Sequence, residues 1–304
     1  MEKTNTLWKR IRRCWKLYVF LIPGIVITLL FKYWPMYGIQ LAFKDYIPGQ
    51  TISEAPWVGL KHFERFFSMP NCGQLIWNTF KVAVASNFFG FPLPIILAIM
   101  LNQVKNMRFK KLVQNVTYMP YLFSIVVAMG VASILLAPNT GLVNLIIQKF
   151  GGEQILFYGD DKYVVPIYLL TALWQNTGYS AVIYLAALAS VDEGQIEAAR
   201  IDGANRFQII RHVEIPAISG TIFTMLILNA GRVFAVGADR MLLIQTSLNL
   251  NASEILSTYV YKSGLLNAQF GFSTAVELFN TFVNIAFLLI VNYITSKISD
   301  ESIF

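Results

Sequence analysis

Six long apolar segments, separated by more polar stretches, run along the 304-residue chain. A membrane-spanning helix needs about 20 apolar residues, because each residue adds about 1.5 Å and the hydrocarbon core is about 30 Å thick. All six segments reach this length, so the pattern predicts an all-α bundle of about six transmembrane helices. The segments are 17–37, 80–101, 113–137, 164–189, 217–238 and 275–296.

Composition supports the membrane interpretation. Hydrophobic residues make up 56% of the chain and charged residues only 13%, with a mean hydropathy of +0.54. Soluble domains carry roughly a quarter of charged residues. A water-soluble core of this size could not bury so much apolar surface, so we expect an integral membrane protein.

The positions of the basic residues predict the topology. A net charge of +7 would also fit a nucleic-acid-binding protein, but the basic residues cluster beside alternate apolar segments. With six crossings, 14 lie on one side of the membrane and seven in the opposite loops. Basic residues accumulate on the cytoplasmic side, so we expect both termini there and no nucleic-acid partner.

These features divide the chain into four parts. We expect a basic cytoplasmic tail at 1–16, a first span with an external loop at 17–75, a core transmembrane domain at 76–296 and a cytoplasmic tail at 297–304. The external loop is rich in Pro and Gly, with one short helix expected at 61–67. Four prolines fall inside the spans, where each removes a backbone donor and bends its helix. They are Pro23, Pro92, Pro94 and Pro120.

The polar stretch between the fourth and fifth segments, residues 190–216, predicts two short helices. Acidic residues open the first helix, from Asp192, where they suit its positive end. Gly203 then allows a sharp break, and Asn205 can cap the second helix. Pro216 opens the next span, where its missing N–H does least harm. We call this stretch the Glu-Ala-Ala loop, after Glu197 and the two alanines that follow it.

The second of these helices carries an apolar ridge. Phe207 and Ile210, with Ile209 or Val213, recur at helical spacing between Arg206 and Arg211. Such a ridge fits a groove on a partner protein. An amphipathic helix resting on the lipid surface explains it equally well from the residues alone.

Glu197-Ala-Ala, Asp202-Gly203-Ala204 and Ile215-Pro216 closely resemble the cytoplasmic "EAA" loop of permease subunits in ATP-binding-cassette importers. The form of the loop is that of maltose-type sugar permeases. Trp57-Val-Gly-Leu-Lys-His-Phe63 resembles the same family, and Tyr33-Trp-Pro-Met-Tyr-Gly38 resembles a subgroup that imports fragments of complex polysaccharides. The Gly-Gly-Pro signature that is common after the fifth span of maltose-type members is absent near 239–250.

This resemblance implies a type I importer permease of a bacterial cell membrane that translocates a sugar, in particular an oligosaccharide from a complex polysaccharide. It implies a second related permease, two ATPase subunits that bind ATP and Mg²⁺, and an extracytoplasmic solute-binding protein. No cofactor is expected in this chain. The loop would dock into the ATPase as a coupling helix, with Glu197 and Gly203 most sensitive. The implied coupling residues are Glu197, Ala198, Ala199, Asp202, Gly203, Ala204, Phe207 and Ile210.

Polar side chains within the spans are candidates for the substrate pathway. Aromatic faces beside amides suit sugars, whereas an interfacial aromatic belt or interhelical hydrogen bonds explain the same residues. Arg232 could bind an acidic sugar, extend to the membrane surface or pair with Glu277, and we favour the ion pair. The candidates are Trp174, Asn176 and Tyr179 in the fourth segment, Asn229 and Arg232 in the fifth, and Glu277, Asn280 and Asn284 in the sixth.

Other function classes fit the sequence less well. The chain has no phosphate-binding loop motif, no His-Glu-x-x-His motif and only two histidines, so we expect a transport subunit rather than an enzyme. Cys14 and Cys72 would lie on opposite sides of the membrane and could not pair. An ion-coupled transporter needs acidic residues within the membrane, and only Glu277 qualifies.

Overall fold

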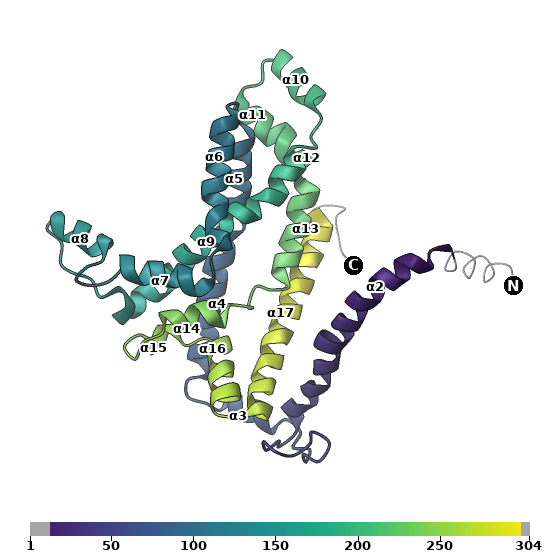
Figure 1. Ribbon diagram of the computed structural model, residues 1–304, viewed down its shortest axis with the longest axis vertical. Helices are drawn as coiled ribbons and strands as arrows, with labels where there is room; N and C mark the ends of the chain where they lie inside the picture. The colour runs from purple at the N-terminus through teal and green to yellow at the C-terminus, as the bar shows by residue number, and fades with distance from the viewer. Residues whose placement is uncertain (1–12, 299–304) are drawn as a thin grey trace.

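The computed structural model describes residues 13–298, and within that range the chain is almost entirely helical (Figure 1). The one β-type pairing there is an isolated antiparallel bridge between Lys44 and Trp57. The all-α prediction is therefore confirmed. Most of the predicted tail 1–16, and 299–304 of the tail 297–304, lie outside the described residues.

Within residues 13–298, eight α-helices are long, and the others are short pieces at bends and in loops. The long helices are α2 (Trp15–Thr28), α4 (Cys72–Gly90), α5 (Pro92–Asn102), α6 (Met107–Tyr118), α7 (Ile125–Leu135), α9 (Val164–Leu188), α13 (Ser219–Ala230) and α17 (Phe270–Ile298). The short ones are α3 (Lys61–Phe67), α8 (Leu142–Lys149), α10 (Glu193–Ile201), α11 (Arg206–Ile209), α12 (Ile215–Ala217), α14 (Ala238–Ile244), α15 (Leu250–Ser253) and α16 (Leu256–Tyr261). The bounds of α3 match the short helix expected at 61–67.

Three helices among the described residues are long and apolar enough to cross a membrane: Trp15–Phe43, Cys72–Asn102 and Phe270–Lys297. Each contains one predicted segment. Two bent pairs raise this number to five if each pair counts as one span. The segment 164–189 forms α9, whose 25 residues give a length of about 37 Å. Gln175 and Asn176 lower its hydropathy, so α9 is not among the five.

The predicted segment 113–137 is not one straight helix. Met107–Leu122 and Ile125–Leu135 meet at 103°. Pro120 lies in the 3₁₀ turn before the bend, as expected of a proline that interrupts a span. Ser124 then caps α7 by accepting a hydrogen bond from the Val127 N–H, so the new helix begins with its donors partly satisfied.

The predicted segment 217–238 is also wrong as a continuous helix. Its helix α13 ends at Ala230 and meets Arg206–Ala217 at 62°. Beyond it the backbone of 231–237 is irregular, and distant side chains satisfy it. The Phe234 N–H donates to Asn284 Oδ1 at 2.9 Å, and the Gly237 N–H donates to the Tyr168 hydroxyl at 3.2 Å. Such partners allow non-helical backbone at membrane depth.

The first span makes almost no contact with the rest of the chain. Figure 1 shows α2 standing apart from the other helices, and none of its residues is buried. Only its far end, the 3₁₀ helix η2 (Trp34–Phe43), packs against α17. Its apolar surface is therefore available to lipid or to another protein.

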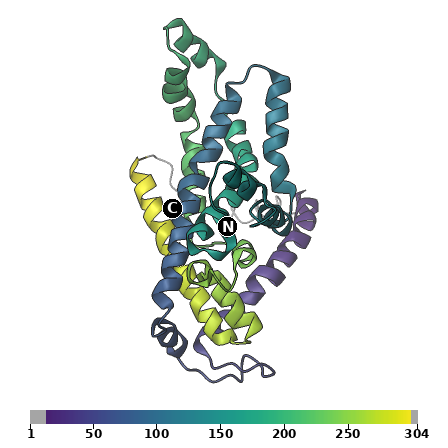
Figure 2. The same ribbon diagram turned by 90° about the vertical axis from the view of Figure 1, so that its left-hand side faces the viewer.

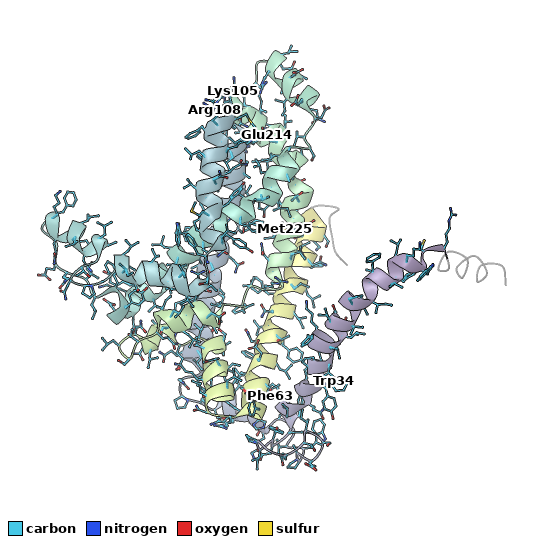
Figure 3. All side chains as sticks on the ribbon, viewed as in Figure 1. Trp34, Phe63, Lys105, Arg108, Glu214 and Met225 are labelled. Carbon is cyan, nitrogen blue, oxygen red and sulfur yellow. The ribbon has the colours of Figure 1, made fainter. Side chains whose placement is uncertain are left out.

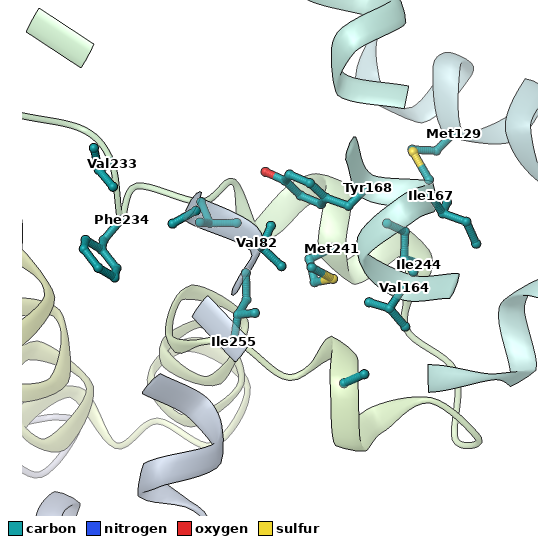
Figure 4. Packing of buried hydrophobic residues seen from close by; sticks show 13 residues of the cluster. Val82, Met129, Val164, Ile167, Tyr168, Val233, Phe234, Met241, Ile244 and Ile255 are labelled. Atoms are coloured by element: carbon teal, nitrogen blue, oxygen red, sulfur yellow. The ribbon is translucent and has the colours of Figure 1, made fainter. Parts of the chain in front are cut away.

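Three apolar clusters within residues 13–298 hold the main bundle together, and one of them joins α3, α4, α16 and α17. The largest one joins α4, α7, α9 and α14 with the irregular segment after α13, around Val82, Ile167, Phe234 and Met241 (Figure 4). The third cluster joins α5 and α9 through Ala98, Tyr184 and Leu188, with Ile218 at the bend before α13. This third cluster lies beneath the Glu-Ala-Ala loop.

Different segments lie at the two ends of the molecule. The Glu-Ala-Ala loop, with α10 and α11, lies at one end, and α3 with the loop before it lies at the other (Figures 1 and 2). Between them, α4, α5, α9, α13 and α17 form the body.

Candidate functional site: the Glu-Ala-Ala loop and the cavity beneath it

The Glu-Ala-Ala loop folds as its sequence predicts. Asp192 caps α10 by accepting a hydrogen bond from the Gly194 N–H at 3.0 Å. Gly203 follows α10 with φ of +82°. The Gly203 N–H donates to the Arg200 carbonyl and the Ala204 N–H to the Ala199 carbonyl, the pair of bonds that defines a Schellman ending. The sharp break is therefore confirmed, and it requires a left-handed residue.

The second helix also begins at the expected residue. Asn205 and Gln208 form a capping box, in which each side chain accepts from the backbone N–H of the other. The prediction that Asn205 caps this helix is confirmed. Both helices are thus fixed by hydrogen bonds within the loop itself, which gives the loop a defined shape without any partner.

The loop presents large apolar side chains outward. Phe207 is 69% exposed and Ile201 is 86% exposed. Ile209 faces inward at 5% exposure, so the ridge contains Phe207 and the half-buried Ile210 rather than Ile209. Sequence reasoning missed Ile201, which could have been recognised as an apolar residue at the polar end of α10. Phe207 and Ile201 are candidates for contact with another protein.

The motif residues surround a hollow at the elbow between the two helices. It has a volume of about 300 Å³ and is lined by Ala199, Asp202, Gly203, Ala204 and four residues of the second helix and its continuation. Glu197 and Ala198 are exposed on α10 beside it. The structure therefore brings four of the eight predicted coupling residues together around one hollow.

A buried carboxylate joins this loop to the end of α5. Glu214, the last residue of the π-helical turn η6 (Ile210–Glu214), is 3% exposed. Its carboxylate accepts hydrogen bonds from Gln103 Nε2, at 2.8 and 3.0 Å, and from Asn102 Nδ2, at 3.1 Å. Sequence reasoning did not select Glu214, although an acidic residue immediately before an apolar segment is a usable signal.

A second hollow, which we call the body cavity, lies beneath the loop. It has a volume of about 590 Å³ between α4, α5, α9 and α13. Its polar groups come from Ser86, Asn87, Ser180, Tyr179 and Asn229. The Tyr179 ring stacks on Tyr121 with centroids 3.9 Å apart and planes 4° apart. Hydroxyls, amides and an aromatic face without formal charge suit a neutral polyhydroxylated ligand.

The other candidates of the fourth segment lie outside this cavity. Trp174 lines an apolar hollow of about 460 Å³ between α7 and α9, and its ring lies 6.4 Å from that of Phe123. Asn176 lines a smaller hollow of about 180 Å³ and donates to the Ala172 carbonyl of its own helix. Of the fourth-segment candidates, only Tyr179 lines the body cavity.

The polar stripe of the sixth segment has mainly internal partners. Asn284 accepts from the Phe234 N–H and donates to the Asn280 carbonyl. Asn280 is buried, and its Oδ1 has no hydrogen-bond partner. Glu277 lies within reach of the Asn280 side chain. For Asn284 the structure therefore favours the interhelical interpretation over contact with substrate.

The ion pair predicted between Arg232 and Glu277 is not formed. The three ion pairs within residues 13–298 join Lys61 to Asp45, Lys162 to Asp160 and Lys262 to Glu254. The prediction assumed that the helix continued through Arg232. In the structure α13 has ended, and the Arg232 N–H closes a turn onto the Asn229 carbonyl, so the expected helical register does not apply.

A different arginine, which sequence reasoning did not select, is buried. Arg240 is 5% exposed and donates from Nη2 to Gln175 Oε1 at 2.6 Å. Its guanidinium also lies 5.8 Å from the centre of the Tyr168 ring. Gln175 in turn donates to the Phe123 carbonyl at 2.7 Å. This chain of contacts joins α14 and α9 to the bend before α7, so Gln175 has a structural role.

A family model described as "Binding-protein-dependent transport system inner membrane component" matches residues 90–300. The chain belongs to this family. It is therefore a multi-pass component of a bacterial inner membrane and a transport subunit rather than an enzyme. The matched region includes α5, α9 and α13 of the cavity wall and the whole Glu-Ala-Ala loop, but only the last residue of α4.

Relatives in the family are similar over almost the entire chain. Protein LplB of Bacillus subtilis (strain 168) is 38% identical over 288 residues, which cover 95% of this chain and 91% of that protein. The polygalacturonan/rhamnogalacturonan transport system permease protein YteP of the same organism is 39% identical over 303 residues, covering 100% and 94%. The arabinooligosaccharides transport system permease protein AraP is 26% identical over 284 residues, covering 93% and 88%.

Solved structures show the same fold. A chain from a bacterial ABC transporter involved in the import of the acidic polysaccharide alginate matches with a TM-score of 0.88 and 34% identity, covering 97% of this chain and 99% of that chain. A second alginate transporter structure, in complex with an alginate pentasaccharide-bound periplasmic protein, matches with the same score and identity. The resemblance to sugar permeases is confirmed.

Proposed function

We propose that this chain is one of two membrane subunits of an ATP-driven importer, and that it carries oligosaccharides released from a complex polysaccharide. The preformed Glu-Ala-Ala loop, with Phe207 and Ile201 exposed at its surface, is the observation that carries the proposal. An isolated amphipathic helix on lipid would not need two caps, a Schellman break and a hollow at the elbow. A protein groove accounts for all of these features.

In this proposal the loop docks into a separate ATPase subunit. Phe207 and Ile201 enter a cleft of the ATPase, while Glu197 and Gly203 determine how the two short helices meet its surface. ATP and Mg²⁺ are bound by two such ATPase subunits, and this chain holds no cofactor. Closure of the ATPase dimer then switches the spans between inward-facing and outward-facing states, which requires different contacts in the two states.

The remaining partners occupy the other surfaces. The chain crosses the membrane six times, with α9 and the two bent pairs each counted as one crossing, and both termini are cytoplasmic. The unburied first span lies against lipid and against the second, related permease subunit. An extracytoplasmic solute-binding protein delivers the substrate at the end that contains α3.

The substrate class follows from the cavity and from the relatives. Tyr179 offers a ring face, and Asn229 with the neighbouring polar groups offers hydrogen bonds to hydroxyls. Relatives that are similar over most of the chain are named for polygalacturonan, rhamnogalacturonan and arabino-oligosaccharides, and the solved transporters import alginate. All of these are fragments or forms of complex polysaccharides.

The proposal is tested by reconstituting the chain with its co-purifying partners in proteoliposomes. ATP hydrolysis is measured with and without the solute-binding protein loaded with pectin-derived oligosaccharides. We expect loaded binding protein to stimulate hydrolysis at least severalfold, and Gly203→Asp in the loop to abolish the stimulation. Gly130→Ala, where a methyl group would meet no atom within 4 Å, serves as the control and should leave the stimulation unchanged.

The main alternative predicts a different result. If no ATPase subunit co-purifies and uptake into vesicles follows an ion gradient, the chain is an ion-coupled transporter. In that case Glu277, the acidic residue of the sixth segment, becomes the first residue to substitute.

A further inference from the structure

Glu214 is a buried acidic residue without a cationic partner. It is 3% exposed, and none of the three ion pairs within residues 13–298 includes it. Its partners are the side-chain amides of Asn102 and Gln103, which are neutral. Burial of a carboxylate has an unfavourable desolvation free energy even when the group is hydrogen-bonded, and a well-packed apolar residue would join the same helices without it. Packing alone therefore does not explain why a glutamate occupies this position.

The three hydrogen bonds join two elements that line different parts of the site. Glu214 ends η6, directly after the exposed surface of the Glu-Ala-Ala loop, whereas Asn102 ends α5 and Gln103 follows it. Further along α5, Pro94 lines the body cavity. Figure 3 shows Glu214 at the loop end of the molecule, with Met225 of the cavity wall farther into the body. The chain itself joins the loop to α9 and α13, and the hydrogen bonds of the Glu214 carboxylate add a third connection, to α5.

The geometry of the backbone keeps this carboxylate in place. Glu214 closes a π-helical turn, and such turns often occur at functional sites. Ile218, four residues later, is buried in the cluster that joins α5 to α9. The Glu-Ala-Ala loop is thus attached to α5 by the hydrogen bonds of Glu214 and by the apolar packing of Ile218.

We propose that Glu214 is a positioning residue that makes the Glu-Ala-Ala loop and α5 move as one rigid unit, so that a displacement at the ATPase reaches the cavity wall. If η6 separated from α5, the carboxylate would lose all three hydrogen bonds while remaining near a low-dielectric core. Separation is therefore strongly disfavoured. An apolar contact alone would allow the two elements to slide, because apolar attraction has no direction.

The inference rests on the proposed function, since it assigns to Glu214 the transmission of movement from an ATPase. The full complex is reconstituted in proteoliposomes, and uptake of pectin-derived oligosaccharides is divided by ATP hydrolysed. Glu214→Ala should leave ATPase subunits bound and ATP hydrolysis within about twofold of wild type, while oligosaccharide uptake per ATP falls at least about tenfold. Glu153→Ala, which removes an exposed glutamate between α8 and α9, should leave this ratio unchanged.

A swap of the two partners separates coupling from simple folding. Gln103→Glu alone places two carboxylates face to face and should lower uptake per ATP as Glu214→Ala does. Gln103→Glu combined with Glu214→Gln exchanges amide and carboxylate, restores the pair and should restore most of the ratio. A purely structural role would reduce the amount of assembled complex without changing uptake per ATP in the complex that remains.

Two results would overturn the inference, and they differ from each other. If wild type couples ATP hydrolysis to uptake but Glu214→Ala keeps the wild-type ratio, Glu214 does not transmit movement, although the proposed function stands. If the wild-type complex shows neither substrate-stimulated hydrolysis nor uptake, the proposed function fails and the inference fails with it.

Discussion

The Glu-Ala-Ala loop and the region around the α7–α9–α14 contacts are stabilised in opposite ways. Within the loop, the shaping hydrogen bonds join residues at most five apart, such as Ala204 to Ala199 and Asn205 to Gln208. Around α9, the key bonds join Gln175 to Phe123, 52 residues away, and to Arg240, 65 residues away. The two short helices of the loop can therefore keep their shape when distant contacts change, whereas the α9 region depends on the whole fold. The attachment of the loop to α5 through Glu214 is separate from this internal shape.

The largest effect on stability, and therefore the strongest test of this comparison, is expected at Gln175. Gln175→Leu leaves both a buried guanidinium and the Phe123 carbonyl without their partner, so we expect a loss of about 3 kcal/mol in the free energy of unfolding. An average interhelical hydrogen bond in a membrane contributes only about 0.6 kcal/mol. The measurement is equilibrium unfolding in detergent micelles.

The control for Gln175 is its neighbour Asn176. The Asn176 amide donates only within its own helix, so Asn176→Leu should cost less than about 1 kcal/mol. Equal effects of the two substitutions would show that the contacts of Arg240 do not stabilise this region.

The packing of α6 on α9 provides the next largest effect. A Cβ at Gly178 would collide with the backbone carbonyl of Thr117, and neither backbone can yield easily. We expect Gly178→Ala to cost about 2 kcal/mol through overpacking. The same unfolding measurement with Gly130→Ala in α7, where the added methyl meets nothing within 4 Å, should show no loss. A neutral Gly178→Ala would mean that α6 and α9 do not pack so closely in the protein.

The loop should respond locally to a change at Gly203. The site has open space for a side chain but a φ of +82°, so Gly203→Ala costs about 1 kcal/mol through backbone strain alone. Gly203→Asn should cost less, since Asn tolerates this conformation better. Amide hydrogen exchange should increase only within 193–209. Increased exchange in α9 would contradict the independence of the two regions.

The smallest effect on stability is expected at the solvent-exposed ion pair between Lys61 and Asp45. The hydrogen bond and charge of Lys61 lower the pKa of the Asp45 carboxyl, and the two groups lie 2.9 Å apart although 16 residues separate them. A lowered folded-state pKa stabilises the protein above the unfolded value of about 3.9. The contribution disappears as pH falls through the folded pKa.

Because both side chains are about half exposed, the pair should contribute less than about 0.5 kcal/mol. Thermal unfolding of wild type and Asp45→Asn is compared at pH 6 and pH 3, and the small difference at pH 6 should become smaller at pH 3. If Asp45→Asn lowers the free energy of unfolding by more than about 1 kcal/mol at pH 6, the exposed pair stabilises the protein more than expected. Burial would then not explain why Gln175 contributes more than this pair.

The sequence predicted those parts of the molecule whose causes are local. Runs of apolar residues identified the helices, and Asp192, Gly203 and Asn205 marked the ends of the two loop helices, because capping involves neighbouring residues. The bends could not be located in the same way. The end of α13 depends on Asn284, 50 residues beyond Phe234, and hydropathy carries no information about such partners.

The site was predicted unevenly for the same reason. Phe207 was expected at the surface from helical spacing and is exposed, whereas Ile201 and Glu214 were missed. Arg232 was assigned a partner from an assumed helical register that the structure does not have. Tyr179 and Asn229 were chosen by residue type, and only the fold shows that they share a cavity.

The isolated first span has a consequence for how the protein responds to its bilayer. Trp15–Phe43 has 29 residues, more than the about 20 that a hydrocarbon core requires. A span that is too long tilts to avoid hydrophobic mismatch. Because this chain holds the span only at its η2 end, the tilt is set by membrane thickness and neighbouring molecules, and a thicker bilayer would bring the span more upright.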